Sequence, residues 1–173
     1  ILVDIVESAL ESARSRIEKK IHKGVETGAF SPAMAEEMMN SITYTTDYQA
    51  IGGSDIVLEA ATEDEKVKNI IFNQVEEICS DNCLFLSNSS HMRPEEIFKN
   101  ISDKSRCLVT HYFFPAERNP VVEIVPGKKT TSTITELLMG FYEAIGKVPI
   151  KVKSSYGYAI DPIFEGLCQT AII

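Results

Sequence analysis

Short apolar runs alternate with amphipathic helical patterns along most of this chain, and that alternation limits the fold more than any other feature of the sequence. Strand patterns occur at 56–60, 83–87, 106–112, 121–126 and 148–153. Helical patterns at 63–78, 93–101 and 133–146 lie between them. Strands and helices that alternate at this spacing predict an α/β domain built on a largely parallel sheet. We expect the last two strands to add a mixed or antiparallel edge.

The strongest helical patterns carry an apolar residue every three or four positions, which gives a helix one apolar face. In residues 7–27 these positions are Leu10, Ala13, Ile17, Ile21 and Val25. In residues 63–78 they are Val67, Ile70, Ile71, Val75 and Ile78. Gly28 is predicted to cap the first of these helices, and Ser31 with Pro32 to start another. Residues 1–5 and 42–48 predict short strands, and the final apolar run, 159–173, predicts a helix to the chain end.

The composition excludes several classes of partner. The chain has 173 residues and a net charge of −8, which argues against a nucleic-acid-binding surface. No apolar run approaches the ~20 residues that span a bilayer, so no membrane segment is expected. The cysteines (Cys79, Cys83, Cys107 and Cys168) form no Cys-x-x-Cys pair, and no histidine lies at zinc-finger spacing. We therefore expect reduced thiols, no metal site and a cytoplasmic location.

An acid, Asp4, closes the first strand pattern. In a doubly wound nucleotide-binding fold, an acid at the end of the second strand accepts hydrogen bonds from the adenine ribose and selects NAD over NADP. The G-x-G-x-x-G motif that precedes such an acid by about 20 residues does not occur in the 173 residues. Because an aspartate that ends a strand is common, Asp4 alone leaves a purely structural role open.

Polar residues also follow two later strands. The strand at 83–87 runs into the sequence Ser87-Asn88-Ser89-Ser90, and His111 lies at the end of the strand at 106–112. Ligands bind at the carboxyl ends of strands in open α/β sheets. A simple polar turn without a ligand has the same composition and is the alternative. Glu123 lies inside the apolar run "VVEIV", where a buried carboxylate needs a partner. An imidazole would serve, so we predict that Glu123 orients His111, a side chain suited to take a proton near neutral pH.

Several separated motifs together resemble the L-3-hydroxyacyl-CoA dehydrogenases. They are "DIVLEAATEDEKVKNIIFNQVEEI", "LFLSNSS", "THYFFPAERNPVVEIVPG" and "ITELLMGFYEAIGKVPIKVKSSYGY". Ser90 lies 21 residues before His111, Glu123 lies 12 after it and Asp161 lies 50 after it, as expected for that family's active site. The resemblance implies a Rossmann-like doubly wound sheet without its first strand and glycine-rich loop. It also implies two partial domains, an NAD(P)-binding domain at 1–156 and the first helix of a helical substrate and dimerisation domain at 157–173.

The resemblance further implies a function and a set of roles. The reaction would be the NAD-dependent oxidation of an L-3-hydroxyacyl-CoA in β-oxidation, with His111 as general base, Glu123 orienting it and Ser90 bonding the C3 oxygen of the substrate. Asp161 would complete the catalytic set. The expected NAD-binding residues are Asp4, Ala61, Glu63, Lys68 and Asn88. A homodimer formed through the helical domain is implied, and the 173 residues alone are expected to show little turnover.

Two positions depart from the family pattern, because Phe114 and Asp161 stand where the family has asparagines. An ionised carboxylate cannot donate a hydrogen bond to a substrate carbonyl, so a different substrate is one alternative. A sister dehydrogenase acting on another β-hydroxy acid would keep Asp4, Ser90 and His111. A non-catalytic nucleotide-binding module is the other alternative, although the presence of the whole set Ser90, His111 and Glu123 disfavours it.

Overall fold

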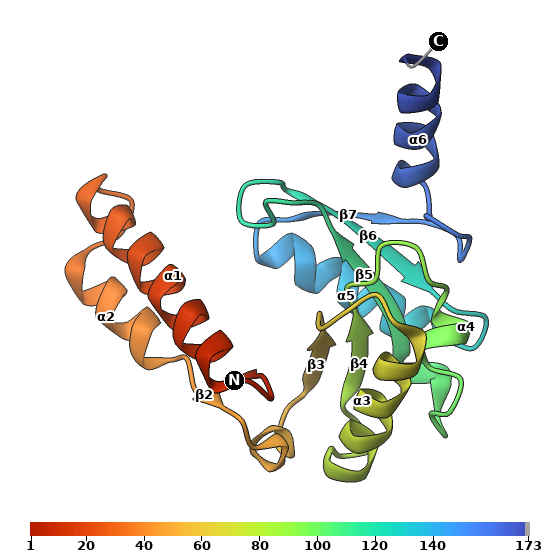
Figure 1. Ribbon diagram of the computed structural model, residues 1–173, viewed down its shortest axis with the longest axis horizontal. Coiled ribbons are helices and arrows are strands. Elements are labelled where there is room, and N and C mark those ends of the chain that lie inside the picture. Colours follow the sequence, from red (N-terminus) through yellow and green to blue (C-terminus); the bar gives the residue numbers. More distant parts are fainter. Residues whose placement is uncertain (172–173) are drawn as a thin grey trace. The chain divides into compact units, whose positions relative to one another are not determined.

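The computed structural model describes residues 1–171, and the chain divides after Gly53 into two compact units. The larger unit, from Ser54 onward, contains a five-stranded sheet in the order β3-β4-β5-β6-β7 (Figure 1). Its strands are β3 (Ile56–Glu59), β4 (Leu84–Ser87), β5 (Cys107–Tyr112), β6 (Val121–Pro126) and β7 (Val148–Lys151). Strands β3, β4 and β5 are parallel, β6 is antiparallel to β5, and β7 is parallel to β6. The predicted α/β fold and its mixed edge are therefore confirmed.

Helices cover both faces of this sheet. They are α3 (Glu65–Ile78), α4 (Pro94–Ile97) and α5 (Ser132–Ala144), with a 3-10 turn, η2 (Lys104–Arg106), before β5. On one face Leu84, Leu86 and Leu108 pack in a buried cluster with Leu138 and Tyr142 of α5. Phe85, between Leu84 and Leu86, lies 6.0 Å from Phe72 of α3, measured between ring centroids. Because neighbouring side chains of β4 point to opposite faces, one strand supplies both layers of the core.

The helix α3 buries a different stripe from the one predicted. Val75 is buried as expected, but Val67 and Ile70 are 41% and 58% exposed. The buried residues of the helix are Lys68, Asn69, Phe72 and Val75. The buried face of α3 differs from the predicted one because the Lys68 side chain points into the core, where it pairs with the buried carboxylate of Glu59 in β3. The predicted helix at 93–101 is also shorter, since the chain leaves the helix at Phe98.

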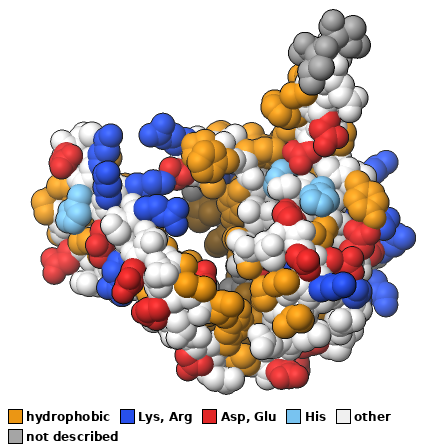
Figure 2. Space-filling view, in the orientation of Figure 1, with side chains coloured by type: hydrophobic (Ala, Val, Ile, Leu, Met, Phe, Trp, Pro, Cys, Tyr) orange, Lys and Arg blue, Asp and Glu red, His pale blue; other side chains and the backbone are white. Residues whose placement is uncertain are grey.

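The smaller unit is a helical hairpin closed by a two-stranded parallel sheet. Its elements are β1 (Leu2–Val3), α1 (Glu7–Glu26), α2 (Pro32–Asn40), β2 (Tyr44–Thr45) and the 3-10 turn η1 (Tyr48–Ile51). Gly28 follows the end of α1 with a φ of 76°, and the Ser31 side chain accepts a hydrogen bond from the Met34 amide, as both cap predictions require. Lys and Arg side chains gather along α1 (Figure 2).

The last described element is α6 (Ile160–Ala171), where Pro162 lies in the first turn. A missing N–H is tolerated there because the first amides of a helix have no intrahelical acceptor. The prediction that this helix continues to residue 173 falls partly outside the described residues. Among residues 1–171, no helix combines the length and apolar character that a membrane crossing requires.

Candidate functional site

His111 and Glu123 lie directly opposite each other on the antiparallel strands β5 and β6. The two atoms His111 Nδ1 and Glu123 Oε2 are 2.9 Å apart. The side chain of Glu123 is fully buried, and that of His111 is 6% exposed. The contact predicted from the sequence is therefore present, and the cross-strand register brings the two residues together.

The second oxygen of Glu123 holds the start of α6. Its Oε1 accepts hydrogen bonds from the backbone amides of Ala159 and Ile160, at 3.0 and 3.1 Å. A carboxylate that accepts from these amides and from His111 requires Nδ1 of the ring to carry the proton. The other ring nitrogen, Nε2, is then a free acceptor, since it has no partner among the described residues.

The Tyr158 ring lies beside the His111 ring, and the sequence patterns did not identify it. It is 5% exposed and has a φ of 53°, a left-handed conformation that is uncommon outside glycine. Its hydroxyl lies 2.6 Å from the Met92 carbonyl and 3.0 Å from the Ser89 carbonyl, and its ring centroid is 5.6 Å from that of His111. Burial raises the pKa of its phenol, and the nearby Glu63 carboxylate adds to the shift.

The loop after β4 presents Asn88 and Ser90 at the same edge of the sheet. Asn88 Oδ1 accepts a hydrogen bond from the amide of Tyr112, the last residue of β5, at 3.0 Å. Glu63 fixes the rest of the loop, because its two oxygens accept from the Ser89 hydroxyl and the Ser90 amide at 2.8 and 2.5 Å. The Ser90 hydroxyl and the Asn88 amide nitrogen keep no partner within residues 1–171. They are therefore available to a ligand.

A buried ion pair joins Glu59, the last residue of β3, to Lys68 of α3 near this edge of the sheet. No sequence pattern indicated Glu59. Lys68 Nζ lies 2.8 and 3.0 Å from the two carboxylate oxygens, and both side chains are 2% exposed. Ser87 and the Ala61 amide also donate to Glu59, at 2.7 and 2.8 Å. The sequence signal for a buried acid was the position of Lys68. It lies three positions before Ile71 and seven before Val75, on the same helical face as these apolar residues, so it needs a buried anionic partner.

The remaining predicted site residues are more scattered. Asp161 is half-buried in the first turn of α6 and has no hydrogen-bond or ion-pair partner in the described chain. Phe114 is 97% exposed in the loop after β5. Asp4 belongs to the smaller unit, where its Oδ1 accepts from the Val6 amide at 2.9 Å.

Three groups with hydrogen-bonding capacity left over thus lie at the carboxyl ends of β4 and β5: the Asn88 amide, the Ser90 hydroxyl and His111 Nε2. They fit a polar cofactor together with an alcohol oxygen, because one is a proton acceptor and two can donate. Within residues 1–171, no group of three or more His, Cys, Asp or Glu residues could hold a metal ion.

Comparison with known proteins agrees with this arrangement. Residues 1–155 match the protein family described as 3-hydroxyacyl-CoA dehydrogenase, NAD binding domain, which gives NAD as the cofactor. A fatty acid oxidation complex subunit alpha from Shewanella halifaxensis is 32% identical over 160 residues, which cover 92% of this chain and 23% of that protein. The chain therefore spans about a quarter of the length of the curated relatives that it matches.

Solved structures show the same likeness. A 3-hydroxybutyryl-CoA dehydrogenase from Escherichia coli superimposes with a TM-score of 0.86 at 30% identity, over 88% of this chain and 32% of that one. An (S)-3-hydroxybutyryl-CoA dehydrogenase from Ralstonia eutropha gives a TM-score of 0.89 at 26% identity, over 94% and 57%. With the sheet topology and the matched residues, these likenesses establish that the chain belongs to the 3-hydroxyacyl-CoA dehydrogenase family through that family's NAD-binding domain.

Proposed function

We propose that this chain is the NAD-binding and base-carrying part of an enzyme that oxidises an L-3-hydroxyacyl-CoA to the 3-oxoacyl-CoA. The observation that carries the proposal is the pair His111–Glu123, because a buried, oriented imidazole with an open Nε2 is what alcohol oxidation needs. The family match and the NAD cofactor are consistent with it.

In the proposed reaction His111 Nε2 takes the proton of the C3 hydroxyl, and the oxygen becomes the carbonyl of the product. Glu123 keeps the ring in the required tautomer and stabilises the imidazolium that forms. The Ser90 hydroxyl holds the C3 oxygen in line with the base. NAD, when bound, accepts the hydride that leaves C3.

We assign the cofactor-side positions by the same logic. Asn88 and Ala61 lie at the carboxyl ends of β4 and β3, where the strands of an open sheet meet their ligands. Glu63 and Lys68 act more indirectly: Glu63 fixes the Ser90 loop, and Lys68 neutralises Glu59 while lying 3.9 Å from Glu63. Asp4, in the smaller unit, is proposed to accept from the adenine ribose.

Asp161 favours a second candidate substrate. Its carboxylate has no protein partner in the described chain, and it opens α6 beside the residues that hold Glu123. An ionised carboxylate cannot donate a hydrogen bond to a thioester carbonyl, and it would favour a β-hydroxy acid that carries a further hydroxyl or a cationic group. The reaction and the base would be the same.

The test uses the intact protein with NAD and L-3-hydroxybutyryl-CoA or a longer homologue, followed by the absorbance of the reduced cofactor. We expect His111→Gln to lower turnover by about 10²- to 10⁴-fold, the usual contribution of general base catalysis, with the fold intact. His22→Gln, an exposed histidine on α1, is the matched control and should retain full activity.

Wild-type turnover in His111→Gln would contradict the assignment of the base. If the wild type were inactive on acyl-CoA substrates but active on another β-hydroxy acid, the second candidate would hold. The homodimer and the cytoplasmic location predicted from the sequence stay predictions.

A further inference from the structure

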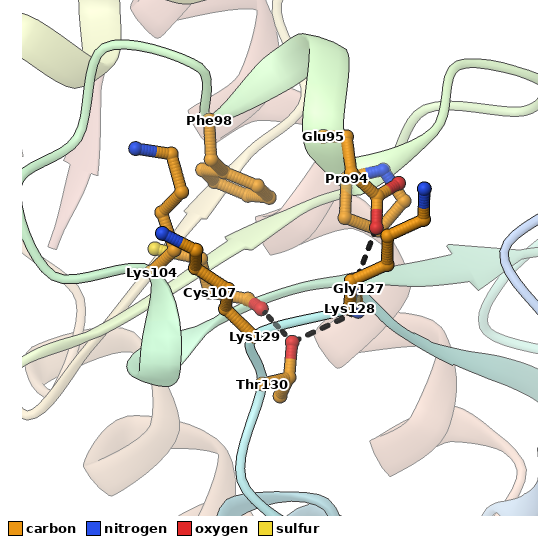
Figure 3. Close-up of a pocket in the computed structure, with 9 residues that line it drawn as sticks. All are labelled: Pro94, Glu95, Phe98, Lys104, Cys107, Gly127, Lys128, Lys129 and Thr130. Carbon is orange, nitrogen blue, oxygen red and sulfur yellow. Dashed lines mark hydrogen bonds between the residues drawn. The ribbon is translucent and has the colours of Figure 1, made fainter.

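A pocket lies at the opposite end of β5 from His111, and no step of the proposed reaction uses it. Its floor includes Cys107, the first residue of β5, and its lining continues on α4 and on the turn after β6 (Figure 3). Four residue steps of strand separate Cys107 from His111, or about 13 Å. We propose that this pocket binds a small amphipathic anion, a linear apolar tail with a carboxylate or phosphate head.

The floor of the pocket suits an apolar tail. Phe98 and Cys107 are 1% and 2% exposed, and Pro94 of α4 is also buried. Burial raises the pKa of the Cys107 thiol to about 12, so the floor carries no charge at neutral pH. The cavity has a volume of about 240 Å³, below the ~300–1,000 Å³ of drug-sized ligand sites, so the ligand must be small.

The rim of the pocket carries three lysines. Figure 3 shows Lys104 and Lys129 on one side of the Phe98 ring and Lys128 on the side of Glu95. Lys104 Nζ donates to the Ile101 carbonyl at 2.5 Å. The ammonium groups of Lys128 and Lys129 make no hydrogen bond or salt bridge with a described residue. On a protein whose net charge is −8, this concentration of positive charge over an apolar floor selects for an anionic head.

One carboxylate, Glu95, also faces the pocket, and each of its two oxygens already accepts a hydrogen bond. Its Oε1 accepts from the Lys128 amide at 2.7 Å, and its Oε2 accepts from the Ser154 hydroxyl at 2.8 Å. Three ammonium groups against one carboxylate leave an excess of two positive charges at the rim. Glu95 therefore shapes the wall of the pocket without cancelling its charge.

The turn that carries Lys128 and Lys129 is held in place by hydrogen bonds of the Thr130 side chain. The Thr130 hydroxyl donates to the Cys107 carbonyl at 2.5 Å and accepts from the Gly127 amide at 2.8 Å. A Cβ at Gly127 would lie 3.0 Å from Pro94 Cβ, so the turn lies close against α4. A rigid turn reduces the entropy lost when the lysines bind an anion.

The experiment is a titration of the ¹⁵N-labelled intact protein with octanoate, octyl phosphate, octanol, octylammonium and inorganic phosphate. We expect octanoate or octyl phosphate to shift the amide signals of Gly127, Lys128 and Thr130 saturably, and the stronger of the two identifies the head group. Octanol, octylammonium and inorganic phosphate should bind much more weakly, because each lacks either the charge or the tail. Octanol that binds as well as the anions, or amides at 127–130 that do not respond to them, would overturn the proposal.

Two kinds of variant separate charge from shape. The double substitution Lys128→Gln with Lys129→Gln should weaken anion binding about tenfold, since each exposed ion pair contributes modestly. Lys66→Gln and Lys151→Gln, exposed lysines on α3 and β7, are matched controls and should bind as the wild type does. Cys107→Leu fills the floor and should block the tail. Unchanged affinity in the double lysine variant would refute the site even if Cys107→Leu failed to fold.

Discussion

Glu59 and Glu123 are both buried carboxylates in the same sheet, but they differ in what neutralises them. Glu59 faces the ammonium of Lys68 and two further donors. Glu123 faces an imidazole, the type of side chain best suited to proton transfer, and two backbone amides. The first arrangement fixes a charged side chain in the core. The second, in the role that we propose, lets the His111 ring gain and lose a proton. Burial alone therefore does not distinguish the two roles that we propose for these acids, and the identity of the partner side chain does.

Removing the cation tests the structural member of the comparison and should have the largest effect on stability. Lys68→Met leaves Glu59 buried without its counter-charge, which we expect to cost about 3 to 5 kcal/mol in the free energy of unfolding. Urea denaturation measures this. Adding Glu59→Gln to the same chain should restore much of the loss, because the amide oxygen can still accept from the Ala61 amide while the amide nitrogen donates to the Ser87 hydroxyl. Equal stability of Lys68→Met and the wild type would show that the pair is not structural.

Glu123→Gln tests the second buried acid, which we propose orients His111. The amide oxygen can still accept from Ala159 and Ile160, but the amide nitrogen then donates to His111 Nδ1 and forces the proton onto Nε2. We expect turnover to fall about a hundredfold or more with a near-native fold, as measured by cofactor reduction and circular dichroism. A loss of fold with little loss of specific activity would reverse the roles assigned to the two acids.

Tyr158→Phe sharpens the comparison, because Tyr158 contacts the His111 ring and tethers the Ser90 loop. The loss of its buried hydroxyl leaves two carbonyl groups without that donor and should lower the free energy of unfolding by about 1 to 2 kcal/mol. If Tyr158 also positions the base, kcat should fall while KM for NAD stays constant. Tyr156→Phe, a change at the exposed tyrosine two residues earlier, serves as the control for turnover.

A partly exposed carboxylate, Glu96, extends the comparison and should show the smallest effect. Its hydrogen bond from Arg93 lowers its pKa from 4.5 to about 2, and Tyr156 also donates to it. Because the folded pKa lies below the unfolded one, this contact stabilises the protein fully above about pH 4.5 and is lost as the pH falls toward 2. The protection of the amides at residues 154–157, measured against their intrinsic exchange rates, should fall over that range. In Glu96→Gln the protection of these amides should not change with pH.

The sequence predicted the elements whose pattern is strong and local. The helix at 7–27, the strands around Phe85 and Val109, and the His111–Glu123 contact were all predicted, the last because a buried acid requires a donor. Glu59 was missed because an acid at a strand end resembles a solvated one, and because Lys68 was assigned to the cofactor. Only the three-dimensional register brings their charged groups within 3 Å.

Tyr158 could not be predicted for a different reason. Glycine is the usual sign of a left-handed backbone, and Gly157 beside it does have a φ of 68°. Nothing in the sequence signals that the next residue is left-handed as well, or that its hydroxyl bonds the carbonyls of Ser89 and Met92 more than 60 residues earlier in the chain. Such tertiary constraints are invisible to periodicity and spacing.

The bonds from Ala159 and Ile160 to Glu123 also bear on how this molecule can be divided. A chain shortened to residue 156, the domain limit suggested by the sequence, would lose both amide donors and leave the buried carboxylate with His111 alone. Anyone isolating the sheet unit for crystallisation or isotope labelling should therefore keep the first turn of α6. The smallest piece that can hold its own base in register ends inside a helix rather than in the loop before it.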